Sequence, residues 1–257
     1  MNWPASLVDE VGSWPDHVRD LIAVVAEPLA DSTDYVQDLH VPDDDVAAIH
    51  AALVGTRWRL YHCTRLLDHE RDNILTNGLA PATEVLLDDK LTQAVEHGHL
   101  SPGDAEVLRE SHMLRPGGGQ RQGRQGRICA LTTRASFADY HGLWRLFEHW
   151  GGELIYFDQP DPMLERLRSL GTPSIVVVDL TLITPPSRGW YPPIERLLVG
   201  AHLGMDQVHG ETNQPVNGFW PVNAVWQPNA ADSAAWRWVN LLALDITSKP
   251  PGTIEWE

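Results

Sequence analysis

The spacing of hydrophobic positions predicts helices in the first part of the chain. In residues 15–30, Val18, Ile22 and Val25 recur at helical spacing, and Pro28 marks the end or a kink of this helix. Four more helical patterns have start or stop signals at their ends, such as a Ser-Pro pair or a trailing glycine. These patterns cover residues 42–55, 66–79, 84–98 and 101–114.

Strand patterns become frequent in the second part of the chain. The first strand, "RWRLYHC" (57–63), alternates large apolar and polar residues, and "SIVVVDLTLI" (174–183) has the near-continuous apolar run of a strand buried on both faces. The other expected strands are "RICALTT", "ELIYF", "FWPVNAVW" and "WVNLLALDIT", at residues 127–133, 153–157, 219–226 and 238–247. A helix is expected over residues 136–150.

Helices followed by strands with few helices predict an α+β fold with a largely antiparallel sheet. We expect an N-terminal helical segment, residues 1–55, packed on a core domain formed by residues 56–257. The helices at about 83–114 are expected as an insertion in that domain, and we assign to them the recognition of an acceptor or partner.

Composition narrows the classes of partner. With 19 Lys and Arg against 35 Asp and Glu, the formal charge is −16, and a field of that sign repels phosphate backbones and anionic membranes. The exception is "RPGGGQRQGRQGR" (115–127), which carries four arginines among its glycines. This segment is either a solvated loop or a loop whose backbone approaches a phosphate or substrate closely.

Cysteine usage and hydropathy predict the compartment. Cys63 and Cys129 lie in apolar segments and fit neither a disulfide framework nor a zinc motif. The N-terminus lacks the pattern of a secretory signal, and no apolar run approaches the roughly 20 residues of a membrane helix. We therefore expect a soluble, cytoplasmic protein without membrane contact.

Candidate chemistry is concentrated in three short stretches. His62 and Thr64 fall on one face of the first strand, because alternate residues of a strand share a face. Tyr140 follows the strand "RICALTT", and "WGGE" places Glu153 after two glycines. Taken singly, each of these residues has an ordinary structural reading. Recognised metal-ligand spacings are missing among the histidines, including His69, so no metal site is expected.

In their order along the chain, these stretches resemble the ADP-ribosyltransferase family, in the branch that includes poly-ADP-ribose polymerases and bacterial toxins. The resemblance implies that His62 bonds a ribose hydroxyl of NAD. It also implies that the main chain of Cys63, helped by the Thr64 hydroxyl, holds the nicotinamide carboxamide, and that Tyr140 stacks on the nicotinamide ring. Glu153 would be the catalytic carboxylate. Cys63 departs from the usual glycine of this motif, so its side chain must point away from NAD.

The chemistry of NAD cleavage supports the role of Glu153 independently. Breaking the nicotinamide–ribose bond develops positive charge on the sugar, which a fixed carboxylate stabilises. Gly151 and Gly152 would let a flat ring approach the main chain. NAD is expected in a cleft formed by the strand ends at 61–64, 129–133 and 153.

Three activities stay open at this point. The chain is an ADP-ribosyltransferase acting on a macromolecular acceptor (protein or nucleic acid), an NAD glycohydrolase whose acceptor is water, or a non-catalytic binding protein with the same fold. Similar bacterial proteins are commonly toxins or antiphage effectors with a neutralising antitoxin partner, so the resemblance extends to such a partner here.

Overall fold

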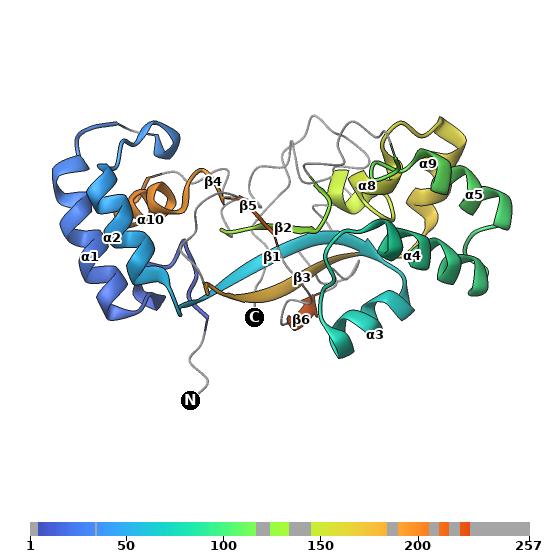
Figure 1. Cartoon of the computed structure of the whole chain (residues 1–257), viewed down its shortest axis with the longest axis horizontal. Coiled ribbons are helices and arrows are strands. Elements are labelled where there is room, and N and C mark those ends of the chain that lie inside the picture. The colour runs from blue at the N-terminus through green and yellow to red at the C-terminus, as the bar shows by residue number, and fades with distance from the viewer. Residues whose placement is uncertain are drawn as a thin grey trace, which may run out of the picture. The chain divides into compact units, whose positions relative to one another are not determined.

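The structure is a computed structural model that describes residues 5–33, 35–116, 124–133, 145–183, 190–205, 211–215 and 222–226 (Figure 1). The fold is α+β, which confirms the predicted class. Six strands in the described ranges form one sheet in the order β4-β5-β2-β1-β3-β6. These strands are β1 (Arg57–Leu66), β2 (Arg127–Leu131), β3 (Thr172–Thr181), β4 (Trp190–Tyr191), β5 (Glu211–Pro215) and β6 (Val222–Trp226).

Antiparallel pairing is observed at two places in this sheet. β1 pairs with β2, with Tyr61 opposite Leu131, and β4 pairs with β5, with Trp190 opposite Thr212. β1, β2, β3 and β6 confirm four predicted strands, although β1 and β3 are displaced or extended by a few residues. β4 and β5 were not predicted. The strand expected at 238–247 lies outside the described residues.

The helices predicted in the N-terminal half are all present. The α-helices with defined bounds are α1 (Asp16–Ala26), α2 (Asp43–Leu53), α3 (Asp68–Asn77), α4 (Glu84–Glu96), α5 (Pro102–Ser111), α8 (Glu153–Tyr156), α9 (Asp161–Ser169) and α10 (Ile194–His202). α9 and α10 were not predicted. Of the helix expected at 136–150, residues 145–148 are helical and residues 134–144 lie outside the described part.

The chain divides into two compact units, each built from several stretches of sequence. Unit 1 comprises residues 1–62, 129–139 and 177–214, and unit 2 comprises residues 63–128, 140–176 and 215–257. The division therefore passes within β1, between His62 and Cys63. The organisation expected from sequence, with a helical segment 1–55 and a domain 56–257, stays a prediction.

Unit 1 contains a group of packed helices, in which α1 contacts both α2 and α10. Val18, Ile22 and Val25 of α1 are buried, as their spacing predicts. His50 Nε2 of α2 lies 2.9 Å from Glu195 Oε2 of α10, and both side chains are largely shielded from solvent. In the sheet of this unit, Asp179 of β3 binds the guanidiniums of Arg57 and Arg59 from β1.

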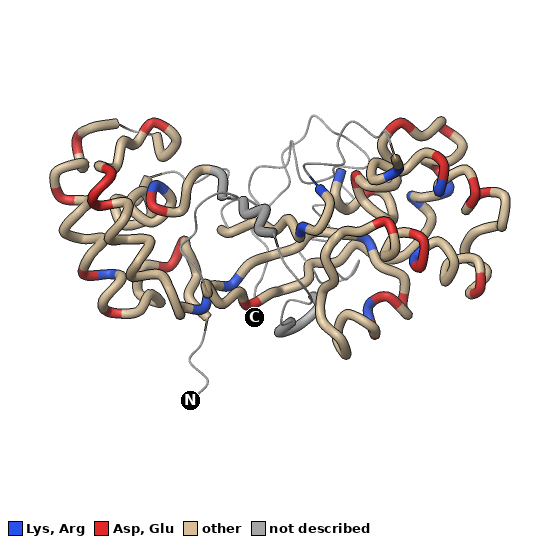
Figure 2. The backbone as a smooth tube through the Cα atoms, viewed as in Figure 1, with Lys and Arg blue, Asp and Glu red and all other residues tan. Residues whose placement is uncertain are grey.

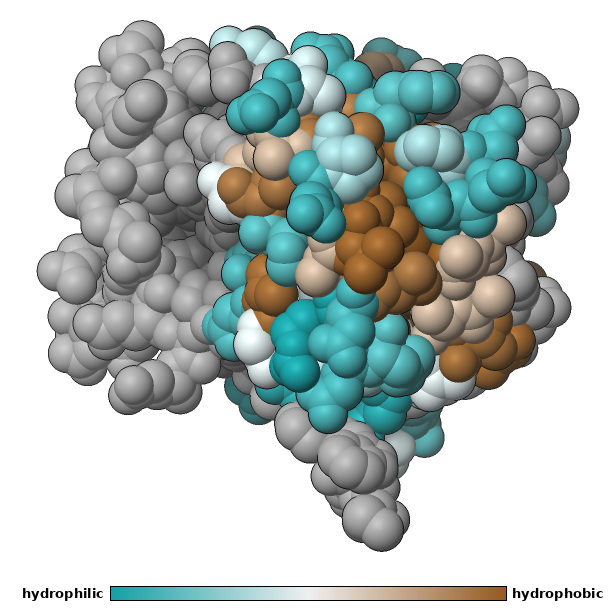
Figure 3. Space-filling view, turned by 90° about the vertical axis from the view of Figure 1, so that its left-hand side faces the viewer, coloured by the Kyte–Doolittle hydropathy of each residue, from teal (hydrophilic) through white to brown (hydrophobic). Residues whose placement is uncertain are grey.

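The surface of the described residues combines acidic side chains with scattered hydrophobic ones. Acidic residues occur on the helices of both units and outnumber basic ones (Figure 2). The face drawn in Figure 3 has hydrophobic residues bordered by hydrophilic ones. Large hydrophobic side chains that are exposed in unit 1 are Val24, Tyr35, Val54 and Ile183. No described helix is both long and apolar enough to cross a membrane.

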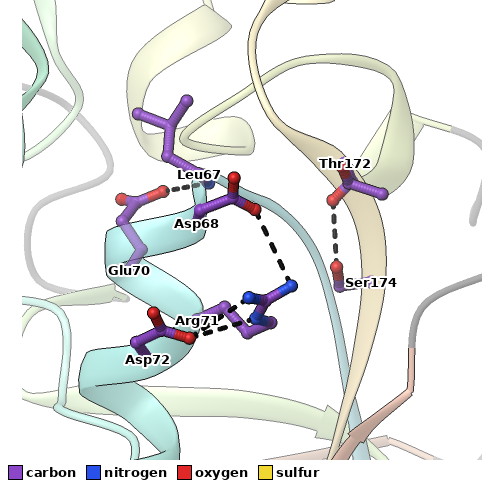
Figure 4. Close-up of polar contacts among 7 residues, drawn as sticks. All are labelled: Leu67, Asp68, Glu70, Arg71, Asp72, Thr172 and Ser174. Carbon is purple, nitrogen blue, oxygen red and sulfur yellow. Dashed lines mark hydrogen bonds and ion pairs between the residues drawn. The ribbon is translucent and has the colours of Figure 1, made fainter. Parts of the chain in front are cut away.

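Unit 2 is built around a buried cluster that joins α4, α5, α8 and α9 and includes the fully buried Trp150. Beside this cluster lies the carboxylate of Glu70, which is 7 % exposed. It accepts hydrogen bonds from Leu67 N (2.8 Å, Figure 4) and Trp150 Nε1 (2.7 Å), and Lys90 Nζ lies 2.6 Å away. Burial alone raises the pKa of Glu70, but Lys90 and these hydrogen bonds outweigh burial and lower it.

We predict that Glu70→Ala lowers the free energy of unfolding by about 3 kcal/mol, because the change removes three interactions and leaves the half-buried Lys90 without its carboxylate. Urea denaturation followed by circular dichroism measures this loss. The matched control is Glu110→Ala on the exposed face of α5, for which we expect a change within about 0.5 kcal/mol. Equal effects of the two substitutions would contradict the central role of Glu70.

Candidate functional site

His62, Cys63 and Thr64 are consecutive residues of β1. His62 Nδ1 lies 2.7 Å from the main-chain oxygen of Cys129 in β2. Because a carbonyl oxygen only accepts, Nδ1 carries the proton in this contact, and Nε2 of a neutral ring is then an acceptor. Cys63 and Thr64 are buried, and strand geometry places Cys63 on the face opposite His62 and Thr64. Neither cysteine of the chain is in a disulfide.

Glu153 does not begin a strand, so the strand predicted at 153–157 is wrong. Residues Glu153–Tyr156 form the short helix α8, which begins directly after two glycines with positive φ, Gly151 at 81° and Gly152 at 58°. A Cβ atom on Gly151 would overlap the side chain of Ile155. The two glycines thus turn the chain tightly enough for Ile155 to enter the core, and the three apolar residues 154–156 follow a helical rather than an extended path.

The carboxylate of Glu153 is held by two arginines. Arg124 NH2 lies 2.5 Å from Glu153 Oε2, and Arg145 Nε lies 3.0 Å from Oε1. The Glu153 side chain is 16 % exposed, whereas those of Arg124 and Arg145 are 34 % and 47 % exposed. A charge-assisted hydrogen bond from Arg124 to Oε2 and an ion pair between Arg145 and Oε1 fix the orientation of the carboxylate.

Tyr156 is a neighbour of this carboxylate, and His149 packs against Tyr156. Their rings lie 4.8 Å apart, and both nitrogens of His149 are buried. Burial, together with the positive charges of Arg168 and Arg65, lowers the pKa of His149 to about 4. Burial and then the charge of Glu153 raise the pKa of Tyr156 to about 12. Near neutral pH, an imidazole and a phenol without charge therefore accompany the Arg124–Glu153–Arg145 group.

Within unit 2, two contacts link the end of β1 to the segment that precedes Glu153. Arg65, next to Thr64, donates from Nε to the main-chain oxygen of Leu170 (2.5 Å) and from NH1 to that of Phe147 (3.1 Å). Glu70, just after β1, accepts from Trp150. Burial lowers the pKa of Arg65, although Glu148 opposes this effect. The hydrogen bonds of Arg65 and Glu70 thus connect the chain just after Thr64 to the chain just before Glu153.

The sequence identified some of these residues and missed others. Tyr140, the predicted stacking aromatic, lies outside the described residues. Arg124 belongs to the 115–127 segment that was considered for substrate contact. Arg145, His149 and Tyr156 were not singled out as site residues. Arg145 lies in an expected helix and Tyr156 in the strand predicted at 153–157, so nothing in the sequence marked either as a site residue. His149, in contrast, directly precedes "WGGE", and this position could have drawn attention to it.

If the guanidiniums gave up part of their contact with Glu153, they could bind a phosphate in a bidentate manner, and the carboxylate could then stabilise positive charge on a ligand. Among the described residues, no group of three or more His, Cys, Asp or Glu side chains has its donor atoms arranged to hold a metal ion.

Comparisons with known proteins identify no family for this chain. No family model, no curated protein and no solved structure matches the chain. Function must consequently be argued from the residues themselves and from the motif resemblance.

We predict that stability falls as the pH drops from about 6.5 to about 4, in part through His149. The folded state lowers the pKa of this imidazole, so the unfolded chain binds the proton first and acid favours unfolding. In His149→Phe this contribution is removed, and the free energy of unfolding should depend less on pH in this window. Urea denaturation at several pH values measures the slope, and the exposed His40→Phe should retain that of the wild type.

Proposed function

We propose that the chain is an NAD-dependent ADP-ribosyltransferase, which transfers ADP-ribose to a macromolecular acceptor and releases nicotinamide. The observation that supports this most is the carboxylate of Glu153, the residue indicated by the motif resemblance. It is 16 % exposed and oriented by guanidiniums at 2.5 and 3.0 Å. A carboxylate fixed in this way is preorganised for charge that develops in a transition state. Under this proposal the sheet belongs to the split, largely antiparallel type of that family.

Binding roles on β1 follow from the same resemblance. The Nδ1 contact with Cys129 orients the His62 ring, and Nε2 would accept a hydrogen bond from a ribose hydroxyl of NAD. The main chain of Cys63 would hold the nicotinamide carboxamide together with the Thr64 hydroxyl. Burial of the Cys63 side chain on the opposite face supports this role, because it keeps the sulfur away from NAD. Tyr140 would stack on the nicotinamide.

The reaction breaks the bond between ribose C1′ and the nicotinamide nitrogen, and the electron pair of that bond stays with nicotinamide. The ribose acquires oxocarbenium character, which the negative charge of Glu153 stabilises. An acceptor oxygen or nitrogen then forms the new bond to C1′ and loses a proton. Arg124 and Arg145, which bind Glu153 in this structure, would exchange part of that contact for the diphosphate of NAD.

The acceptor is a protein or a nucleic acid. The formal charge of −16 disfavours a polyanion, whereas the arginines of the 115–127 segment favour one. The resemblance to bacterial toxins and antiphage effectors extends the proposal to a neutralising antitoxin partner. The helices α4 and α5, within the expected insertion 83–114, are the proposed recognition surface for acceptor or partner.

We predict that Glu153→Gln lowers nicotinamide release by about 10² to 10³ fold, since the change keeps the volume and removes the charge. The assay incubates the full chain with labelled NAD and with protein, DNA and RNA acceptors. Glu165→Gln, an exposed residue of α9, is the matched control and should retain full activity. Label on an acceptor supports transfer, and nicotinamide release without label identifies a glycohydrolase. Absence of both in the wild type would overturn the enzymatic proposal and leave a binding protein.

We also predict that His62→Ala lowers kcat/KM for NAD about tenfold, which corresponds to the loss of one hydrogen bond to the ribose. Most of the loss should appear in KM, because the bond is made in the ground state as well. Steady-state kinetics of nicotinamide release measure both constants. The exposed His40→Ala should behave as the wild type, and an unchanged KM in His62→Ala would refute the ribose contact.

A further inference from the structure

The outer face of α2 in unit 1 is apolar. A helix on the surface of a globular protein normally carries polar residues on the face that it turns to solvent. In α2 the acidic residues end at Asp45, and the only titratable residue after them, His50, is bonded to Glu195 of α10. The exposed positions that follow Asp45 are Ala47, Ala48, Ala51 and Val54.

The neighbouring helix α1 extends this apolar surface. The two helices run antiparallel (Figure 1), and His17 Nε2 near the start of α1 lies 3.0 Å from the main-chain oxygen of Ala52 near the end of α2. Because both helices rise by about 1.5 Å per residue, this contact places Leu21 of α1 level with Ala48 of α2. About one turn further along α1, the side chain of Val24 is 70 % exposed. The surface that we call the α1–α2 strip consists of Leu21, Val24, Ala48, Ala51 and Val54.

The contiguity of the strip distinguishes it from an ordinary surface. Single exposed apolar residues are common in proteins, whereas a continuous apolar surface with a polar border is typical of a protein contact. Figure 3, which views the side of the molecule where α1 and α2 lie, shows hydrophobic residues gathered within a hydrophilic border. The α1–α2 strip therefore has the composition of a binding surface.

The charge of the same part of the chain restricts the chemistry of the partner. Residues 5–55 contain eleven Asp and Glu but a single Arg. That residue, Arg19, is already paired with Asp16 at 2.6 Å. The helices of unit 1 thus carry a large share of the negative charge of the chain (Figure 2). A partner with positive charge is attracted to this field.

Two exposed carboxylates border the strip directly. Asp20 precedes Val24 by four residues on α1, and Asp44 precedes Ala48 by four residues on α2. Residues four apart in a helix are neighbours on its surface. Negative charge therefore lies beside the strip on both helices, where it would meet the flanks of anything bound between them.

The same charges disfavour two other occupants. A second copy of the chain would bring an equally acidic surface to the strip, and like charges across an interface repel each other. An anionic membrane is repelled in the same way, because helices that bind membrane surfaces carry Lys and Arg on their polar face.

We propose that the α1–α2 strip binds a partner protein through an amphipathic helix whose apolar face is flanked by Lys and Arg. Apolar side chains at helical spacing would pack on the strip, as in other complexes that recognise a helix by its apolar face. α1 and α2 have 11 residues each, so about three turns of a partner helix fit along them. The strip belongs to unit 1 and depends neither on NAD chemistry nor on the roles proposed for α4 and α5.

The test is the binding of synthetic peptides to the full chain, followed by fluorescence anisotropy. The probe is a labelled helical peptide of about four turns with Leu on one face and Lys on the other, and a second peptide has Glu in place of Lys. We expect saturable binding of the Lys peptide and none of the Glu peptide. Added salt should weaken the binding, because it screens exposed charges.

Val24→Gln should raise the Kd of the Lys peptide about tenfold, because it removes an apolar contact. The matched control is Val85→Gln on α4, since the Val85 side chain is also 70 % exposed and should be irrelevant to binding. Asp20→Asn should weaken binding and its salt dependence, whereas Asp89→Asn on α4 should not. All four positions are exposed, so the fold should persist, which circular dichroism checks.

The proposal is overturned if the Lys peptide shows no saturable binding, if the Glu peptide binds as tightly, or if Val24→Gln binds as the wild type does. Sedimentation of the chain alone and flotation with phosphatidylcholine vesicles test the other occupants. Self-association or vesicle binding that is lost in Val24→Gln would assign the strip to a second copy or to a lipid surface and would also overturn the proposal. None of these measurements depends on NAD turnover.

Discussion

The buried carboxylate of Glu70 is the interaction on which unit 2 depends. It joins the first turn of α3, Lys90 of α4 and the indole of Trp150. Trp150 directly precedes the glycine turn that leads to Glu153, and α3 directly follows the β1 strand that carries Thr64. One charge, stabilised by three partners, therefore determines where the candidate catalytic carboxylate and the end of β1 are anchored. It also places His69, the neighbouring residue, beside the end of α4.

Local signals explain why much of the fold was readable from the sequence. Ser101 accepts a hydrogen bond from Asp104 N and Pro102 occupies the first turn, as the pattern indicated for α5. The strand predicted at "ELIYF" was wrong, because the periodicity of a short apolar run does not distinguish a strand from a helix. There the deciding factor was the packing of Ile155 under Gly151, which is a tertiary constraint. α9 has its own local signal in Met163 and Leu167, four residues apart, and was nevertheless overlooked.

The site was less predictable, because its contacts join distant residues. Glu153 meets Arg124 from 29 positions upstream, and Glu70 meets Trp150 across 80 positions. No local rule relates residues at such distances, so only the identity of Glu153, and not its arginine partners, could be inferred from a motif. The two glycines before it were predicted to let a flat ring approach the main chain, and that role stays a prediction. Their role in the structure is to close a turn over Ile155.

Electrostatics relate the arginine pair to the rest of the molecule. The chain carries a formal charge of −16, yet the carboxylate of Glu153 contacts two guanidiniums, so basic side chains gather at this point of an acidic protein. A long polyanion experiences the field of the whole surface, whereas a ligand with a single diphosphate interacts mainly with the charges within a Debye length, about 8 Å. A diphosphate bound beside Glu153 would therefore interact mainly with Arg124 and Arg145 and less with the acidic surface of the whole chain. Under the proposed function, the diphosphate of NAD is such a group.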